Sequence, residues 1–280
     1  MSETIIAIIL GLVEGITEYL PISSTGHLIL FNEALQFTGE RAKNFDIVIQ
    51  LGAILSVLVL YRERFLSLIP DFRELRRNPR LSLAPGIYGT AGLVKLALVS
   101  LPALVLAFLF GKQIKLHLFA PLPVAIALAV GAILILLVES SKLTQHQRQV
   151  EELTWQQSLV IGLVQCLALW PGMSRSASTI VGGMVVGLSR RSAAEFSFLA
   201  AVPILAIAAI HDLVEAVRVF SLEDLKLVAI GFVVSFVSAL VSIKWFVGIV
   251  SRWSLRPFAY YRLGVAALVV YLLMMRSAPG

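Results

Sequence analysis

The chain has 280 residues, of which 58% are apolar and only 14% are charged, and its formal net charge is +6. Soluble domains carry about 25% charged residues, so this chain has too few to cover a surface that faces water. The composition indicates an integral membrane protein. It argues against a disordered chain, a soluble enzyme and a nucleic-acid-binding protein, because there is neither a polar surface nor a long basic tract.

The apolar stretches predict an all-α membrane protein with about six transmembrane helices. A helix needs about 20 mostly apolar residues to cross a bilayer, and the stretches that approach this are 45–61, 87–110, 122–138, 196–210, 225–250 and 258–275. Two more apolar stretches, 5–20 and 159–188, are interrupted at 21–26 and 171–176 by proline, glycine and hydroxyl residues. Lipid cannot satisfy the backbone groups that such breaks free, so we expect two broken re-entrant helical hairpins, buried in protein or lining a wet cavity.

The two interrupted stretches resemble each other when one is displaced by 151 positions. Residues 11–14 then align with 162–165, 23–25 with 174–176, and Phe45 with Phe196. Each half, about 1–140 and 152–280, reads as one interrupted hairpin followed by three spans. Because the chain crosses the membrane three times in the first half, the second half begins on the opposite side and is inverted relative to the first. We therefore predict a single polytopic membrane domain made of two inverted-topology repeats, with one central site that uses both breaks.

Lys and Arg residues are enriched in cytoplasmic loops, so their distribution predicts the orientation. If the loop at 62–86 is cytoplasmic, twelve basic residues lie on that side: Arg62, Arg64, Arg73, Arg76, Arg77, Arg80, Lys142, Arg148, Arg190, Arg191, Arg252 and Arg256. The opposite side then holds six: Arg41, Lys43, Lys112, Lys115, Arg218 and Arg276. On this count, both termini and the entrance of the first hairpin lie at the outer face.

Glu14 and Glu18 stand four residues apart in an otherwise apolar helix, so both carboxylates project from one face, about 6 Å apart. A charge at membrane depth costs at least ~2.5 kcal/mol. A divalent cation, a basic partner such as Arg175, or protonation of one glutamate would offset this cost. The alternative is an interfacial helix with both glutamates in water.

The first break carries hydroxyls, a glycine and an imidazole in Ser23, Ser24, Thr25, Gly26 and His27. Ser and Thr are favoured helix N-caps, and the free N–H groups of a helix start bind anions. His27 is a candidate general acid or base near neutral pH. Its alternative role is that of a capping or core histidine.

The second break places Arg175 among four hydroxyl residues at the expected start of a half-helix: Ser174, Ser176, Ser178 and Thr179. A guanidinium offers a planar fork of donors that matches phosphate oxygens, and the helix dipole adds partial positive charge. The segment therefore predicts a phosphate cradle. The alternative is a purely structural ion pair between Arg175 and Glu14 or Glu18.

Other polar residues in apolar surroundings are weaker candidates. Gln50, Asp46 and Glu195 could support the site, although solvation at the interface or helix capping is the simpler role. We expect long cations near the span ends to snorkel toward a membrane boundary, and aromatic residues there to form interfacial belts. The first group is Lys95, Lys244 and Arg262, and the second includes Trp170, Tyr260 and Tyr261.

Three segments, EGITE at 14–18, PISSTGH at 21–27 and PGMSRSAST at 171–179, together resemble the signature motifs of the bacterial undecaprenyl-diphosphate phosphatases, the bacitracin-resistance phosphatase family. The similarity extends along the chain, including 44–46, 48–52 and 195–198. The resemblance implies an enzyme of the bacterial inner membrane. Such an enzyme hydrolyses a C55 polyprenyl diphosphate to the monophosphate and phosphate, which recycles the lipid carrier for peptidoglycan synthesis and confers bacitracin resistance.

The resemblance also assigns roles to residues of this chain. The family's acidic motif falls on Glu14 and Glu18, its serine–histidine motif on Ser24 and His27, and its arginine motif on Ser174, Arg175, Ser176 and Thr179. We expect Ser23 and Thr25 to help bind phosphate, and a Mg²⁺ or Ca²⁺ ion to join the phosphates to the two glutamates. Two mechanisms stay open: Ser24 is the nucleophile with His27 as base, or His27 activates water while Ser24 binds phosphate.

The expected partners are a polyprenyl diphosphate lipid and membrane lipid, with the diphosphate entering from the outer face and no nucleic acid. The rival hypothesis is a transporter or translocase of a polyprenyl phosphate lipid that uses the same central site, because inverted repeats with broken helices are transporter architecture. A membrane-adapted acid phosphatase is disfavoured, because no lysine-plus-arginine motif precedes Ser24. The sequence leaves the oligomeric state open, a homodimer included.

Overall fold

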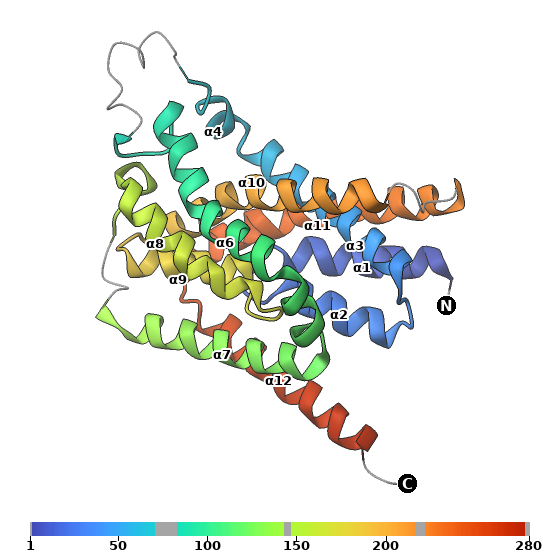
Figure 1. Ribbon diagram of the computed structural model, residues 1–280. Coiled ribbons are helices and arrows are strands. Elements are labelled where there is room, and N and C mark those ends of the chain that lie inside the picture. Colours follow the sequence, from blue (N-terminus) through green and yellow to red (C-terminus); the bar gives the residue numbers. More distant parts are fainter. Residues whose placement is uncertain (1, 71–82, 143–146, 217–221, 278–280) are drawn as a thin grey trace.

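A computed structural model describes residues 2–70, 83–142, 147–216 and 222–277, and it presents them as helices joined by short loops (Figure 1). Residues 211–216, 222–224 and 276–277 are described by their backbone alone. Six predicted loop and terminal cations lie outside the described side chains: Arg73, Arg76, Arg77, Arg80, Arg218 and Arg276.

Six helices in the described part are long and apolar enough to cross a membrane, which confirms the six predicted spans. They are α3 (Glu40–Leu60), α6 (Gly89–Leu118), α7 (Pro121–Ser140), α10 (Arg190–Ala216), α11 (Leu222–Val250) and α12 (Arg256–Ser277). Several extend beyond the predicted apolar stretches. For example, α3 begins five residues before Phe45, because a helix continues through polar end turns that a count of apolar residues leaves out.

Shorter helices form two pairs, and each pair is interrupted where the sequence predicts a break. The first pair is α1 (Glu3–Thr17) and α2 (Ser24–Ala34); the second is α8 (Trp155–Gln165), extended by the 3₁₀ turn η4 (Cys166–Leu169), and α9 (Arg175–Val185). In Figure 1 the pairs approach from opposite sides of the molecule, and their turns meet near its middle. Two short elements, α4 (Arg62–Leu66) and η3 (Val150–Glu152), complete the described helices.

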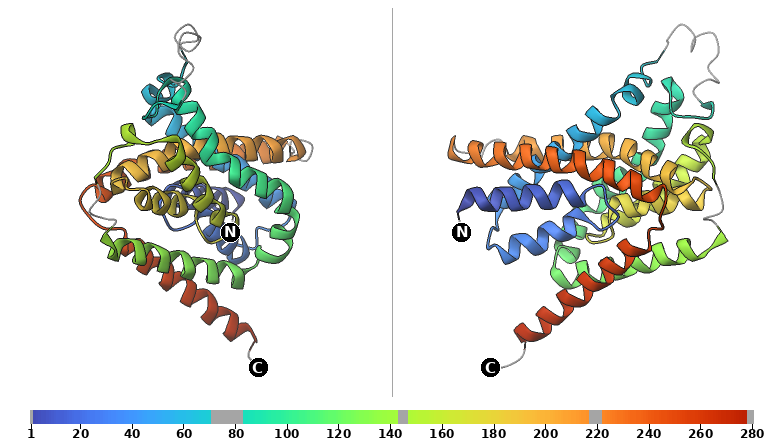
Figure 2. Two further views of the ribbon diagram at one scale, coloured as in Figure 1. Left: turned by 60° about the vertical axis from the view of Figure 1, so that its left-hand side comes forward. Right: turned by 180° about the vertical axis from the view of Figure 1, so that it is seen from behind.

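The helices pack as a bundle in which the two halves interlock. Helix α1 packs on α11, α8 packs on α6, and α3 contacts both α10 and α11. Helices α7 and α12 form a pair along one edge of the bundle (Figures 1 and 2). The start of α1 and the end of α12 lie toward the same side of the molecule. The largest apolar cluster surrounds α9 and α10 and includes Tyr19, Phe196, Phe198 and Phe246.

Two cations do not snorkel, and that expectation was wrong. Lys95 and Arg262 are both 0% exposed. Each is buried because backbone carbonyls satisfy its donors: the Lys95 ammonium donates to the carbonyls of Ala84 and Ala91, and the Arg262 guanidinium donates to several carbonyls near the breaks. Lys244, in contrast, is exposed.

The contact between α1 and α11 depends on a glycine. A β-carbon at Gly11 would lie 2.7 Å from the carbonyl oxygen of Gly231, closer than real β-carbons approach a backbone atom. We therefore expect Gly11→Ala to lower the free energy of unfolding by about 1–3 kcal/mol, because α1 must move away from α11. Thermal unfolding of the detergent-purified protein measures this.

Gly111→Ala is the matched control, since a β-carbon at Gly111 meets nothing within 4 Å. It should leave the melting temperature unchanged or raise it, because alanine favours a helix over glycine by about 1 kcal/mol. Equal melting temperatures for the two variants would contradict the close approach of α1 to α11.

Candidate active site

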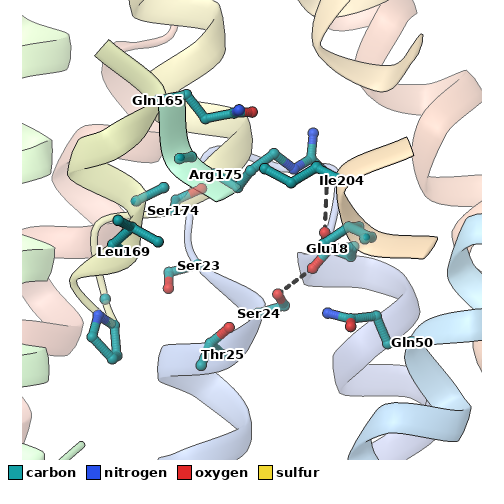
Figure 3. Close-up of a pocket in the computed structure, with 15 residues that line it drawn as sticks. Glu18, Ser23, Ser24, Thr25, Gln50, Gln165, Leu169, Ser174, Arg175 and Ile204 are labelled. Carbon is teal, nitrogen blue, oxygen red and sulfur yellow. Dashed lines mark hydrogen bonds and ion pairs between the residues drawn. The ribbon is translucent and has the colours of Figure 1, made fainter. Parts of the chain in front are cut away.

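Both breaks face one central cavity of about 170 Å³. A water molecule needs roughly 10–15 Å³ of such space, so the cavity can hold a polar headgroup but not a long lipid tail. Its polar lining comes from both halves of the chain (Figure 3): Glu18, Ser23, Ser24, Thr25, Gln50, Gln165, Ser174 and Arg175. Its apolar lining includes Ala103, Leu169, Ile204 and Leu205.

The two breaks share one unusual backbone conformation. Ser23 and Ser174 have φ of 74° and 73°, a left-handed region that costs a non-glycine residue about 1–3 kcal/mol. Each is the N-cap of the helix that follows, because its hydroxyl accepts a hydrogen bond from the N–H three residues on, that of Gly26 at 3.2 Å and that of Ala177 at 3.1 Å. Two half-helix N-termini, which favour anions, therefore begin at the wall of the same cavity.

A polar network joins the two breaks. Arg175 Nη2 donates to Glu18 Oε1 at 2.9 Å, and the Ser24 hydroxyl donates to Glu18 Oε2 (Figure 3). Both side chains of the ion pair are almost fully buried. The fold thus brings together three residues that the sequence predicts, from segments more than 150 residues apart.

Arg175 is held in place by α10. Its Nη1 donates to the Ser197 carbonyl at 2.9 Å and to the Ser197 hydroxyl at 3.1 Å. Its Nε is buried and has no hydrogen-bond partner among the described residues. Ser197 was missed as a site residue, although it follows Phe196 directly, which the repeat alignment had singled out.

Ser176 and Thr179 support the breaks instead of lining the cavity. The Ser176 hydroxyl donates to the Leu20 carbonyl at 2.7 Å, which joins the second break to the first. The Thr179 hydroxyl lies within hydrogen-bond distance of the Arg175 carbonyl oxygen, at 2.9 Å, and of the Ser197 hydroxyl, at 2.6 Å. Contact with phosphate stays a prediction for all five hydroxyl residues. Ser23, Thr25 and Ser174 line the cavity and are therefore the ones placed to make it.

Glu14 is the least satisfied acidic group near the site. It is 0% exposed, and neither carboxylate oxygen has a hydrogen-bond partner in the described part of the chain. It stands one helical turn from Glu18. Glu18, whose oxygens already accept from Arg175 and Ser24, lines the cavity, whereas Glu14 is not among the lining residues. A pair of carboxylates suits a hard cation such as Mg²⁺, which often takes its other ligands from substrate phosphates and water. No group of three or more His, Cys, Asp or Glu that could hold a metal occurs among the described residues.

His27 contacts α12 instead of Ser24. Its Nδ1 lies 2.7 Å from the Ser23 carbonyl oxygen, and its Nε2 lies 2.8 Å from the Tyr261 hydroxyl. A carbonyl only accepts hydrogen bonds, so Nδ1 carries the proton in neutral His27, and Nε2 accepts from Tyr261. Nothing in the sequence distinguished Tyr261 from a belt tyrosine, because this contact is purely tertiary.

The structure gives different surroundings to the three weaker candidates, Gln50, Asp46 and Glu195. Gln50 lines the cavity. Asp46 accepts a hydrogen bond from Asn32 at 2.7 Å, and Glu195 forms an ion pair with Arg191 at 2.9 Å. The structure therefore places Gln50 at the site, whereas Glu195 belongs to an exposed i,i+4 pair.

The comparison with known proteins agrees with this geometry. The family model of "Bacitracin resistance protein BacA" matches residues 7–268. This chain belongs to the BacA family. Similar proteins, each named "Undecaprenyl-diphosphatase", occur in Nitratidesulfovibrio vulgaris, 52% identical over 97% of this chain and 98% of the relative, and in Solidesulfovibrio magneticus, 49% identical over the same shares. "Undecaprenyl-diphosphatase 1" of Bacillus cereus is 42% identical over 98% of this chain and the whole relative.

Because Glu14 is buried without a hydrogen-bond partner among the described residues, its substitution should change the stability of the protein. Glu14→Gln keeps the shape of the side chain and removes the cost of burying, or of protonating, a carboxylate without a partner, so we expect the free energy of unfolding at neutral pH in chelator to rise by about 1–3 kcal/mol. Thermal unfolding in detergent measures it. Glu152→Gln, at an exposed position at the end of η3, should change stability by less than about 0.5 kcal/mol. A Glu14→Gln protein less stable than wild type would contradict this account of Glu14.

Proposed function

We propose that this chain is an undecaprenyl-diphosphatase that hydrolyses undecaprenyl diphosphate to undecaprenyl phosphate and inorganic phosphate. The observation that carries the proposal is the meeting of Arg175 from one break with the Glu18–Ser24 pair from the other, at the wall of one cavity. The names of the relatives are those of hydrolases, so the translocase alternative is not favoured.

The cavity offers the groups that a diphosphate requires. Arg175 places a guanidinium at the cavity wall, and Ser23, Thr25 and Ser174 add hydroxyls beside two half-helix N-termini. Phosphoryl transfer depends chiefly on positioning and on the stabilisation of charge. The polyprenyl tail would remain in lipid and against the apolar part of the lining, which Ala103, Ile204 and Leu205 represent.

We infer that Ser24 is the nucleophile and Glu18 its base, because the Ser24 hydroxyl already donates to the Glu18 carboxylate. The Ser24 oxygen would bond to the terminal phosphorus as the bond from that phosphorus to the bridging oxygen breaks. Undecaprenyl phosphate leaves, and the Ser24 proton passes to Glu18. Water then hydrolyses the phosphoserine and releases phosphate. His27, with both ring nitrogens engaged, would hold the Ser23 turn, and its role as base stays a prediction.

Glu14 and Glu18 would hold a Mg²⁺ or Ca²⁺ ion, and the unpartnered oxygens of Glu14 support this assignment. Such an ion supplies charge neutralisation for phosphate oxygens. The Arg175–Glu18 pair shows that Glu18 shares its charge with a cation of the protein, so Glu14 would contribute the less neutralised carboxylate.

We also propose that the chain is one membrane domain, 1–280, built from inverted repeats at about 1–140 and 152–280. Ser23 and Ser174, which are 151 positions apart, share one backbone conformation. The packing of α1 on α11 corresponds to that of α8 on α6. The hairpins α1–α2 and α8–α9 would then be re-entrant from opposite faces, with the first open to the outer, periplasmic face of the bacterial inner membrane.

Phosphate release by the detergent-purified protein tests the function. Wild type should release phosphate from undecaprenyl diphosphate with Mg²⁺ or Ca²⁺, and chelator should abolish release. Arg175→Ala should lower kcat/KM by about 10²–10³, since it removes a charge aimed at the transferring phosphoryl group. Arg191→Ala, which loses only an exposed pair, should retain activity. A wild-type protein that releases no phosphate from any polyprenyl diphosphate would overturn the proposal.

The nucleophile is tested by trapping. Acid quenching during turnover, followed by mass spectrometry, should find phosphate on Ser24. Ser24→Ala should abolish that signal and lower kcat by at least about 10³, and Glu18→Gln should slow formation of the phosphoserine. Ser251→Ala is the control, because it removes an exposed hydroxyl outside the cavity and should leave both the phosphoserine signal and kcat unchanged. Full activity without any phosphoserine would instead favour attack by water.

Orientation and repeat inversion are tested together by labelling. Thr38→Cys and Arg191→Cys, each in a Cys166→Ala background, place an exposed thiol after the first and the second hairpin. In intact cells, an impermeant maleimide should label Cys at 38 and spare Cys at 191 until the membrane is opened. Labelling of both from outside would contradict the inversion.

A further inference from the structure

Arg262, on α12, makes the most extensive set of polar contacts to the backbone of the breaks. It is 0% exposed, and all its hydrogen-bond partners among the described residues are backbone carbonyls at 2.9–3.3 Å. These carbonyls belong to three separate segments: Pro21 in the first break, Gly172 and Met173 in the second, and Ala127 and Leu128 in α7.

The contacts with the two breaks are equivalent in position. Pro21 and Gly172 are 151 residues apart, the displacement that superposes the two breaks. Arg262 Nη1 donates to the Pro21 carbonyl at 3.0 Å, and its Nη2 donates to the Gly172 carbonyl at 2.9 Å. Each carbonyl lies two residues before a serine N-cap with positive φ. One guanidinium therefore spans the two turns at matching points, directly before the half-helices that reach the cavity.

The planar fork of the side chain suits this task. A guanidinium carries five N–H donors in a fixed plane, whereas an ammonium carries three on a flexible stem. All three nitrogens of the Arg262 guanidinium donate hydrogen bonds, and together they reach five carbonyls from three segments. The burial of a cation without a carboxylate partner is costly, so this side chain holds the carbonyls in a geometry that the backbone of two broken helices does not provide for itself.

The neighbouring helix leaves room for the guanidinium. A β-carbon at Gly131 on α7 would lie 2.0 Å from Arg262 Nη2 and 2.8 Å from its Cζ. Any side chain at position 131 would therefore displace the fork from the carbonyls without removing its charge.

We propose that Arg262 is a positioning residue that fixes the two breaks against each other, so that Ser24 and Glu18 on one side meet Arg175 on the other. It does not line the cavity and acts through the Pro21 and Gly172–Met173 carbonyls. Its loss should therefore impair the alignment of reacting groups more than the binding of the lipid. The kinetic consequence rests on the proposed phosphatase function, whereas the structural consequence does not.

The test compares Arg262→Met, Arg262→Lys and Gly131→Ala with two controls in the full-length, detergent-purified protein. Lys95→Met removes another fully buried cation that donates to carbonyls but contacts neither break. Gly264→Ala adds a β-carbon on α12, two residues from Arg262, where nothing lies within 4 Å. Thermal unfolding establishes a temperature at which every variant is folded, and the two readouts below are taken there.

The first readout is hydrogen exchange by mass spectrometry. Peptides that cover 18–27 and 169–177 should both exchange at least tenfold faster in Gly131→Ala and Arg262→Met, while the rest of the chain is unchanged. The second is phosphate release from undecaprenyl diphosphate. Here kcat should fall at least tenfold in these variants with KM within threefold of wild type, and Arg262→Lys should recover part of kcat.

The controls should match wild type in both readouts. The proposal is overturned if exchange at the two breaks stays at the wild-type rate in Gly131→Ala, or if Lys95→Met lowers kcat as much as Arg262→Met does. If Arg262→Met does not fold, Gly131→Ala and Arg262→Lys decide. A wild-type protein without phosphatase activity would overturn the proposed function, and the exchange measurement would still decide the role of Arg262.

Discussion

The structure depends on one constraint: two helices are broken inside an apolar bundle, and the backbone groups at the breaks cannot turn to lipid. Every such group must find a partner within the protein. Ser23 and Ser174 cap the helices that restart after the breaks. The Ser176 hydroxyl donates a hydrogen bond to the Leu20 carbonyl, and the Arg262 guanidinium donates to carbonyls of both breaks. The same polar groups that make the breaks tolerable bring two anion-attracting helix starts to one cavity.

The buried charges are distributed according to a second requirement, since an ion in such a place needs a counter-charge or many dipoles. Arg175 has a carboxylate partner in Glu18, and Arg262 has carbonyl dipoles. Glu14 has neither among the described residues. Either the positive ligand proposed above or protonation of the Glu14 carboxyl would offset this cost.

The positions of the two breaks were predicted correctly, because proline, glycine and hydroxyl residues are conspicuous in apolar helices. Isolated charges likewise pointed to Glu18 and Arg175, which the fold brings into contact. The sequence placed the start of α9 at Arg175, and it offered the pairing of Arg175 with Glu14 or Glu18 as one of several alternatives. It failed for Lys95 and Arg262, because snorkelling and burial differ only in which carbonyls the folded chain brings near the cation: Ala84 and Ala91 for Lys95, and carbonyls of distant segments for Arg262. The Tyr261 partner of His27 was missed for the same reason.

The chemistry arises from divergence at matching positions of two similar turns. In the 151-residue register, Ser24 corresponds to Arg175, Glu18 to Leu169 and Glu14 to Gln165. The first turn therefore carries the acids and the hydroxyl, and the second carries the cation. Two identical turns would set like charges against each other, whereas this division lets a hydroxyl, its carboxylate acceptor and a guanidinium meet across the cavity. Because each turn supplies only part of the site, activity requires that the turns be held in register, and that is the task to which the contacts of Arg262 are suited.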